Sequence, residues 1–491
     1  MAHKDAIEAK TAVATRWSVF SEIGAKLIAP VANMILARLL APAAFGAVAT
    51  LTVVVSFADV FTDAGFQKYI IQFNAESEDD FNLKSDVAFW SNLLLGLFIW
   101  VLIFIFRDIL AEAVGSPGLG LALVVASSSV PLNALSSIQM ARLRRTFQFK
   151  KLFYARLAGS CMPLVVTVPV AFFTRSFWAL VAGTLATSLC NAIVLSILSG
   201  WKPSFRYSFS TLVEMFSYSW WVLLESISIW ASSSLDTFLV GRALNSRELG
   251  LYKTGTSTVT SIMSLVTSST SAPLFSALSR LQNDQSKLID TFLNYTRAVA
   301  VFVIPLGVCI WLYSDVVTGV LLGSQWNDAT NLVGMWGFAS AICLVLGTYC
   351  NGLYNAVGMT RLSFFVQLVG IAVMVPVVII TSGYGYAVLC VGRVVSRFAI
   401  VLTQLVIMRS VFNVTPARFL SNVAVPAGCS ILMTGVTIPL RTLLPCGLAW
   451  GFVAAPLSLA TYFLSMRIVS KDLIADSLAI LGFNTKGGRN E

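Results

Sequence analysis

The hydrophobic residues of this chain gather in long runs that are separated by short polar segments. A helix needs about 20 apolar residues to cross a bilayer, and runs of about that length follow one another along almost the whole chain. We place the predicted spans at about 17–36, 45–65, 87–106, 119–138, 154–173, 177–198, 216–240, 251–278, 295–313, 332–354, 364–381, 386–408, 423–440 and 448–466. The pattern predicts an all-α polytopic membrane protein with about fourteen transmembrane helices. A count of about twelve would require two of the weaker runs to merge or to be lost.

The chain repeats part of its first helical hairpin near its middle. When Ile35–Gln72 is aligned without gaps to Thr237–Thr254, Arg38 falls on Arg242 and Gly46 falls on Gly250. Weak internal symmetry in an apolar chain is typical of a transporter built from two related lobes. The alternative is chance similarity between two short helical turns.

This symmetry and the loop lengths suggest a division of the chain into six parts. They are a cytoplasmic N-terminal tail (1–15), an N-terminal helical bundle (16–198), a linker between the lobes (199–214), a C-terminal helical bundle (215–408), two additional helices (409–466) and a cytoplasmic tail (467–491).

Composition and charge support a membrane protein and predict its orientation. The chain is 57% hydrophobic and 11% charged, whereas soluble domains carry about 25% charged residues. Its net charge is +10, and the basic residues lie mostly in short loops. With the N-terminus in the cytoplasm, cytoplasmic loops hold roughly three times the Lys and Arg of the opposite loops. We therefore expect both termini in the cytoplasm.

The residue inventory argues against several kinds of chemistry. The one histidine, His3, lies in the N-terminal tail, and none of the eight cysteines forms a C-x-x-C pair. A metal site or a disulfide framework is therefore not expected. The sequence has no Walker A motif and no long extracytoplasmic loop with paired carboxylates. We expect no cofactor and no enzyme, and transport driven by an ion gradient or by the substrate gradient.

Acidic residues inside the predicted spans are candidates for ion coupling. A charge near the centre of a bilayer is costly, so it needs a partner or a function. Asp59 and Asp63 are four residues apart and share one helix face. Glu225 and Asp236 fall near one face of a later span. We assign ion coupling to Asp59, Glu225 and Asp236, with Asp63 closer to the helix end.

Basic residues inside the spans are candidates for binding an anionic group. Lys26 follows Glu22 by four residues, a spacing that also suits a structural ion pair. Arg393 and Arg397 repeat that spacing, and two guanidinium groups on one face suit a phosphate. We assign substrate binding to these three residues and to Arg156, which opens a span. The alternative is that they pair with acids or extend to the interface.

Two hairpin motifs carry a resemblance to a known family. In the first half they are Leu36–Pro42 (LARLLAP) with Phe45-Gly46, Phe57–Gly65 (FADVFTDAG) and Ile70–Gln72; in the second half they are Leu235-Asp236, Val240–Arg242 and Leu249–Tyr252. On these residues the chain resembles the polysaccharide transport family of the multidrug/oligosaccharidyl-lipid/polysaccharide exporter superfamily. The helical layout extends the resemblance to most of the chain, whereas the specific motifs cover only the two hairpins.

The resemblance implies two pseudo-symmetric bundles around a cavity that opens alternately to each side of the bacterial inner membrane. The implied cargo is an oligosaccharide repeat unit on undecaprenyl diphosphate, for exopolysaccharide, capsule or O-antigen assembly. The implied partners are membrane lipids and polysaccharide polymerase or export proteins, with no nucleic acid. Because Arg38 and Arg242 lie at outer helix ends, we expect them to close the periplasmic gate or to anchor the turn.

Two other functions compete with this interpretation. A drug antiporter of the same superfamily should have an acidic cavity for organic cations, whereas the spans here carry basic pairs. A membrane glycosyltransferase or polymerase should need long loops, and every predicted loop is short.

Overall fold

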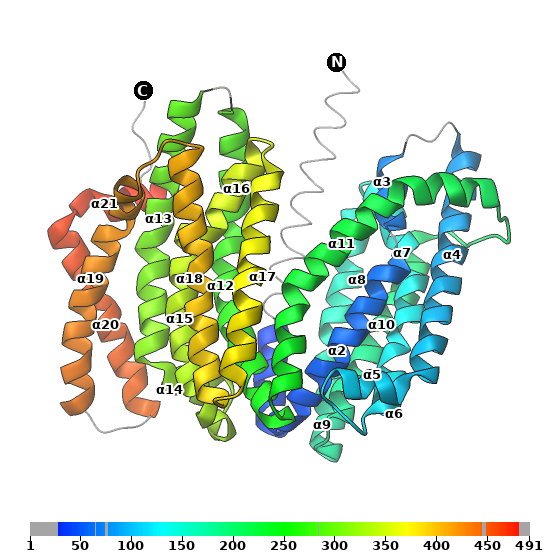
Figure 1. Cartoon of the computed structure of the whole chain (residues 1–491), viewed down its shortest axis with the longest axis horizontal. Coiled ribbons are helices and arrows are strands. Elements are labelled where there is room, and N and C mark those ends of the chain that lie inside the picture. The colour runs from blue at the N-terminus through cyan, green and yellow to red at the C-terminus, as the bar shows by residue number, and fades with distance from the viewer. Residues whose placement is uncertain (1–27, 64, 74–76, 283, 444–447, 481–491) are drawn as a thin grey trace. The chain divides into compact units, whose positions relative to one another are not determined.

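The computed structural model describes residues 28–63, 65–73, 77–282, 284–443 and 448–480, and every regular element in these ranges is a helix (Figure 1). Ten helical segments of the described residues are long and apolar enough to cross a membrane. The other four predicted spans coincide with two shorter apolar helices, Ile28–Leu39 and Val453–Val469, and with two 35-residue helices, α11 (Phe209–Ala243) and α12 (Ser246–Arg280), none of which is among the ten. The chain is a multi-pass, all-α membrane protein.

The chain forms two compact units, residues 1–253 and 254–491. The first unit contains the helix Ile28–Leu39, α2 (Pro42–Asp63), α3 (Phe66–Gln72), α4 (Glu78–Ile105), α5 (Arg107–Ala113), α6 (Gly120–Ser127), α7 (Ser129–Arg145), α8 (Phe149–Met162), the π-helical turn η1 (Pro163–Thr167), α9 (Val168–Thr174), α10 (Trp178–Ser199), α11 and the start of α12.

The second unit contains the rest of α12 and the helices that follow it. They are α13 (Gln285–Leu312), α14 (Ser314–Leu321), the 3-10 turn η2 (Ser324–Ala329), α15 (Thr330–Cys343), the π-helical turn η3 (Leu344–Thr348), α16 (Tyr349–Ala356), α17 (Thr360–Ser382), α18 (Tyr386–Ser410), α19 (Pro416–Leu443), α20 (Leu448–Val469) and α21 (Lys471–Ile480).

Both units contain a long helix that is followed directly by a short one. In the first, only Phe106 separates the end of α4 from the start of α5; in the second, only Tyr313 separates the end of α13 from the start of α14. Neither short helix was expected from the sequence, because seven or eight residues are too few for a span. Their equivalent positions support the internal symmetry that the two hairpins indicate.

The unit boundary lies within α12, after Lys253, and not in the segment 199–214. The reason is that α11 packs against α2, α3 and α4, so it belongs to the first unit. The segment before α11 is also fixed there: Ser204 N and Oγ donate hydrogen bonds to the fully buried carboxylate of Asp86 at 3.0 and 2.8 Å, and Trp90 Nε1 donates to the carbonyl of Ser204 at 2.8 Å.

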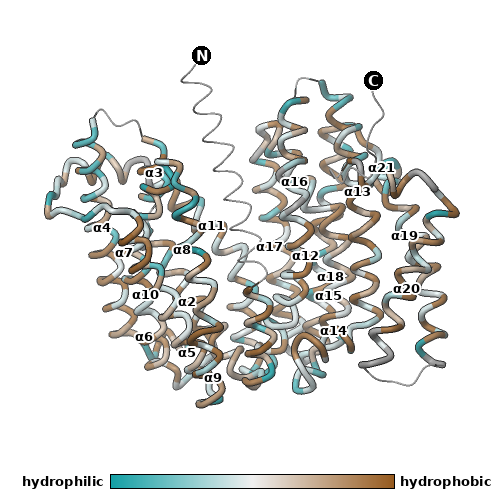
Figure 2. Tube along the Cα trace, turned by 180° about the vertical axis from the view of Figure 1, so that it is seen from behind, coloured by the Kyte–Doolittle hydropathy of each residue, from teal (hydrophilic) through white to brown (hydrophobic). Residues whose placement is uncertain are grey.

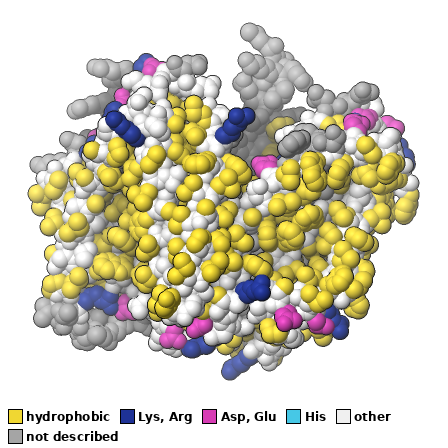
Figure 3. All heavy atoms as spheres, viewed as in Figure 1, with side chains coloured by type: hydrophobic (Ala, Val, Ile, Leu, Met, Phe, Trp, Pro, Cys, Tyr) yellow, Lys and Arg dark blue, Asp and Glu magenta, His cyan; other side chains and the backbone are white. Residues whose placement is uncertain are grey.

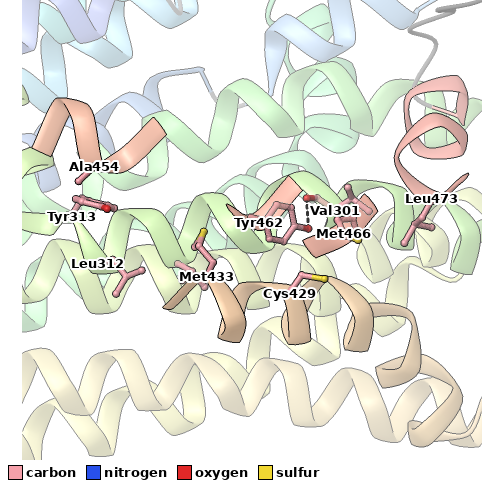
Figure 4. Close-up of a cluster of buried hydrophobic side chains, with 10 residues drawn as sticks. Val301, Leu312, Tyr313, Cys429, Met433, Ala454, Tyr462, Met466 and Leu473 are labelled. Atoms are coloured by element: carbon pink, nitrogen blue, oxygen red, sulfur yellow. Dashed lines mark hydrogen bonds between the residues drawn. The ribbon is translucent and has the colours of Figure 1, made fainter. Parts of the chain in front are cut away.

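The two additional C-terminal helices are part of the second unit. Cys429 and Met433 of α19 and Tyr462 and Met466 of α20 pack with residues of α13 in one buried cluster (Figure 4). Tyr462 is fully buried, and its hydroxyl donates a 2.8 Å hydrogen bond to the carbonyl of Val301 (Figure 4).

The surface is suited to lipid. Figure 2 shows the hydrophobic colour along most of the helical length and the hydrophilic colour mainly near helix ends. On the face in Figure 3, hydrophobic side chains cover the middle and charged ones lie mostly near the upper and lower edges. Large side chains such as Phe98, Phe173 and Ile197 are 59%, 83% and 72% exposed. An apolar surface of this extent requires lipid contact.

Candidate functional site

A ladder of polar side chains joins α2 to α7 inside the first unit. Asn133 Nδ2 donates hydrogen bonds to both carboxylate oxygens of Asp59, at 3.2 and 3.3 Å. One helical turn further on, Ser137 Oγ donates to Asp63 Oδ1 at 3.2 Å. Both helices place their polar pair four residues apart, which is the spacing that keeps side chains on one helix face. Asp59 and Asp63 are both partly exposed.

The third helix at this ladder is α4, which contributes Asn92. Asn92 is 0% exposed, and its Nδ2 donates to Ser137 Oγ at 3.2 Å. Its Oδ1 is buried without a hydrogen-bond partner among the described residues. An unsatisfied buried polar atom costs about 1–3 kcal/mol. Asn92 therefore brings a buried oxygen acceptor close to Ser137, whose hydroxyl is bonded to Asp63.

Cationic side chains surround the Asp63 end of the ladder. Lys68 Nζ and Arg144 act electrostatically on Asp63, whereas their hydrogen bonds are made with other residues. Lys68 forms a 2.8 Å ion pair with Glu225 of α11, and Arg144 Nη1 donates to Gln67 Oε1 at 3.2 Å. The carboxylate of Glu225 thus has a cationic partner within its own unit.

Arg156 is exposed on α8 and lies close enough to Arg144 for their charges to interact. This places Arg156 on the same side of the first unit as Arg144 and Lys68. The structure therefore gathers cations contributed by α3, α7 and α8.

Asp236 lies in a separate environment on α11. Its Oδ2 accepts a 2.8 Å hydrogen bond from the hydroxyl of Tyr252, and Lys253 Nζ donates to Thr237 Oγ1 at 2.9 Å. These bonds join the last turns of α11 to the start of α12. Although Glu225 and Asp236 share a helix, each has its own local partner.

Arg393 and Arg397 lie together in the second unit, on the face of α18 that meets α15. The guanidinium carbons of Arg393 and Arg397 are 5.9 and 4.3 Å from the ring centroid of Trp336. Arg393 Nη1 donates to Ser396 Oγ, and Arg397 Nη1 donates to Ser340 Oγ, both at 2.7 Å. Arg393 is only 7% exposed. Two guanidinium groups beside one indole form a positive, hydrogen-bond-donating cluster.

The equivalent arginines of the two hairpins are both exposed. Arg38 lies in the last turn of the helix Ile28–Leu39, and Arg242 lies in the last turn of α11. A cation in the last turn of a helix interacts favourably with the helix dipole. Lys26 lies outside the described residues.

Some basic residues of the first unit have structural roles. The guanidinium carbon of Arg142 lies 4.3 Å from the ring centroid of Phe81, and its Nη1 donates to Ser85 Oγ at 2.8 Å. Arg145 Nη1 donates to the carbonyls of Ile70 and Phe73 at 2.8 and 2.7 Å. These arginines fasten the end of α7 to α3 and α4.

The neutral members of these clusters do not stand out in the sequence as the charged members do. Asn92, Asn133 and Ser137 are polar residues in apolar helices, and the four-residue spacing of the last two matches that of Asp59 and Asp63. This matching spacing is the sequence feature from which Asn133 and Ser137 could have been recognised as partners of the two acids. Nothing in the sequence distinguishes Trp336 from the other tryptophans. In the described ranges, no group of three or more His, Cys, Asp or Glu residues is arranged to hold a metal ion.

Comparison with known proteins finds relatives along most of the chain. The family profile described as "Polysaccharide biosynthesis protein" matches residues 35–331. The succinoglycan biosynthesis transport protein ExoT of Rhizobium meliloti is 25% identical over 72% of this chain and 70% of that protein. The lipopolysaccharide biosynthesis protein WzxC of Escherichia coli is 21% identical over 76% of this chain and 75% of that protein.

The fold has a counterpart among solved structures. The structure described as "Lipid II flippase MurJ, inward closed conformation" has a TM-score of 0.70 and 14% sequence identity, and the match covers 94% of this chain and 100% of that chain. At this identity the likeness concerns the fold, and it confirms the all-α membrane architecture that the apolar pattern predicts.

Proposed function

Because the chain belongs to the polysaccharide biosynthesis protein family, we propose that it is a flippase for oligosaccharide repeat units linked to a polyprenyl diphosphate. The observation that carries the proposal is the family match over residues 35–331 in a chain that crosses the membrane many times. Two relatives in this comparison are named for succinoglycan transport and for lipopolysaccharide biosynthesis. Exopolysaccharide, capsule or lipopolysaccharide assembly is therefore the proposed pathway class.

The proposed cargo presents a clear physical problem. Its diphosphate cannot cross hydrocarbon unaided, because desolvating its charges is prohibitive. Guanidinium groups bind phosphate oxygens through paired, charge-assisted hydrogen bonds. Arg393 and Arg397, beside Trp336, supply two such groups within a membrane-spanning helix. We assign them to the diphosphate, together with Lys26 and Arg156.

We assign ion coupling first to Asp59, whose hydrogen-bond partner is the neutral amide of Asn133. Glu225 and Asp236 are the further candidates. Their bonds to Lys68 and Tyr252 would have to break or rearrange if they took up an ion during transport. Arg38 and Arg242 are proposed to close the periplasmic gate or to anchor the hairpin turns.

The proposed location is the bacterial inner membrane, with both termini in the cytoplasm. There the chain would receive its cargo from the cytoplasmic leaflet and deliver it to polysaccharide polymerase and export proteins. It acts as a transporter and not as an enzyme. A drug antiporter of the same superfamily is the alternative function, and the arginine pair of α18 disfavours it, because organic cations would be repelled.

A deletion strain tests this function. We expect loss of the surface polysaccharide and accumulation of the complete lipid-linked repeat unit, inaccessible to glycan-degrading enzymes added outside spheroplasts. Complementation with the wild-type gene is the control. Unchanged polysaccharide with increased sensitivity to toxic organic cations would instead support the antiporter.

A further inference from the structure

We propose that α2, α4 and α7 of the first unit hold a sodium ion among the oxygens of Asp59, Asp63, Ser137 and Asn92. The use of this ion to drive transport rests on the proposed function, whereas its binding does not. The three helices pack against one another, so one compact unit supplies all four side chains.

The donor set is made of hard oxygen ligands. Two carboxylates, one hydroxyl and one amide oxygen come from the polar ladder, where Ser137 bonds both Asp63 and Asn92. Ligands of this kind select alkali and alkaline-earth cations over transition metals. Because Asp59 and Asp63 are partly exposed, an ion can reach the ladder from the unit surface.

Asn92 points to a ligand independently of the two acids. It is completely buried, its amide nitrogen contacts the hydroxyl bonded to Asp63, and its amide oxygen has no hydrogen-bond partner in the described part of the chain. A residue needed only for packing would not keep an unsatisfied buried oxygen one hydrogen bond away from the Ser137–Asp63 pair. A cation bound to that oxygen would satisfy it.

The neighbouring charges favour a monovalent ion. Lys68 of α3 and Arg144 of α7 act on Asp63, and Lys68 is itself paired with Glu225 of α11. Arg156 of α8 adds a further positive charge beside Arg144. These cations offset part of the negative charge of the two carboxylates, which disfavours a divalent ion. Sodium binds carboxylate and neutral oxygens together, and its single positive charge matches the negative charge that remains at the site.

The test is binding of radioactive ²²Na⁺ to the full-length protein, purified in detergent and monodisperse. We expect saturable binding of about one ion per chain, displaced by unlabelled sodium and not by choline. Asp59→Asn and Asn92→Leu should each weaken binding at least tenfold. The matched control is Asp284→Asn, because Asp284 caps α13 in the second unit and Asn also caps helices well.

Two results would overturn the proposal. One is the absence of saturable ²²Na⁺ binding by monodisperse wild-type protein. This result overturns the sodium site even if Asp59 proves to be needed for export, because the coupling ion would then be a proton. The other is wild-type affinity in either folded variant. Since Asn92→Leu keeps both carboxylates, it tests the site even if Asp59→Asn does not fold. Polysaccharide export in cells is measured separately, so failure of the sodium site leaves the flippase assignment to its own test.

Discussion

Gly46 and Gly250 lie against each other where the two repeated hairpins meet. A Cβ atom on Gly46 would be 1.7 Å from the carbonyl oxygen of Ser246, and one on Gly250 would be 1.8 Å from that of Pro42. The same sequence offset relates Gly46 to Gly250 and Pro42 to Ser246, so the contact is reciprocal. The starts of α2 and α12 therefore approach across a local two-fold relation, and only glycine permits their backbones to come this close.

Gly46→Ala and Gly250→Ala should each separate α2 from α12. Overpacking costs about 1–3 kcal/mol even where side chains can move, and here the clash is with backbone. We expect lower thermal unfolding midpoints in detergent and loss of polysaccharide export. Gly352→Ala is the control, since its added Cβ would meet nothing within 4 Å. Wild-type stability and export in both variants would show that the contact is not needed.

Arg393→Ala combined with Arg397→Ala should abolish polysaccharide export while membrane insertion stays normal. The physical reason is the loss of both guanidinium groups beside Trp336. Export is measured as surface polymer in a complemented deletion strain, and insertion by the amount of protein in washed membranes. Arg418→Ala is a suitable control, because Arg418 is an exposed member of an ion pair with Asp290. Normal export by a well-inserted double variant would remove these arginines from the substrate site.

Asp86→Ala should release the segment that precedes α11. The change removes two hydrogen bonds to a buried carboxylate, and bonds of this kind contribute about 1.5–3 kcal/mol each. We expect faster proteolysis between residues 200 and 208 and a lower unfolding midpoint. Asp79→Ala breaks only the exposed pair with Arg206 and should cost about 0–1 kcal/mol. Equal proteolysis of the two variants would contradict the anchoring role of Asp86.

Tyr462→Phe tests how α20 is held on α13. The variant keeps the buried ring in the cluster of Figure 4 and loses only the hydrogen bond to Val301. The expected loss of stability is about 1 kcal/mol, against about 3–5 kcal/mol for Tyr462→Ala, which also creates a cavity. Thermal unfolding of the purified variants measures the difference. A Phe variant as unstable as the Ala variant would contradict the conclusion that the ring contributes more to stability than the hydrogen bond.

The sequence predicts the spans well because a bilayer imposes a length and an apolar composition on every crossing helix. It also shows Gly46 and Gly250 as equivalent positions of a repeat, although not their contact, and it carries the family resemblance, which the match over residues 35–331 confirms. The unit boundary within α12 was not predictable, because α11 belongs to the first unit only through its packing on α2, α3 and α4.

The candidate sites were predicted only through their charged members. Asp59, Arg393 and Arg397 stand out because charge is rare in a span. Their neutral partners depend on which helix faces are in contact. Asn133 and Asn92 reach the ladder because α2, α4 and α7 pack together, and Trp336 meets the arginines because α15 packs on α18. One sequence without its contacts does not specify these pairings.

The most direct test of the flippase assignment is transbilayer movement in proteoliposomes. The purified protein is reconstituted with the lipid-linked repeat unit accumulated by the deletion strain, and the fraction of glycan open to a membrane-impermeant glycan-modifying enzyme is followed. The wild-type protein should expose glycan from the inner leaflet, and the double variant of Arg393 and Arg397 should not. If folded wild-type protein leaves the inner-leaflet glycan protected, as in protein-free vesicles, the assignment is contradicted.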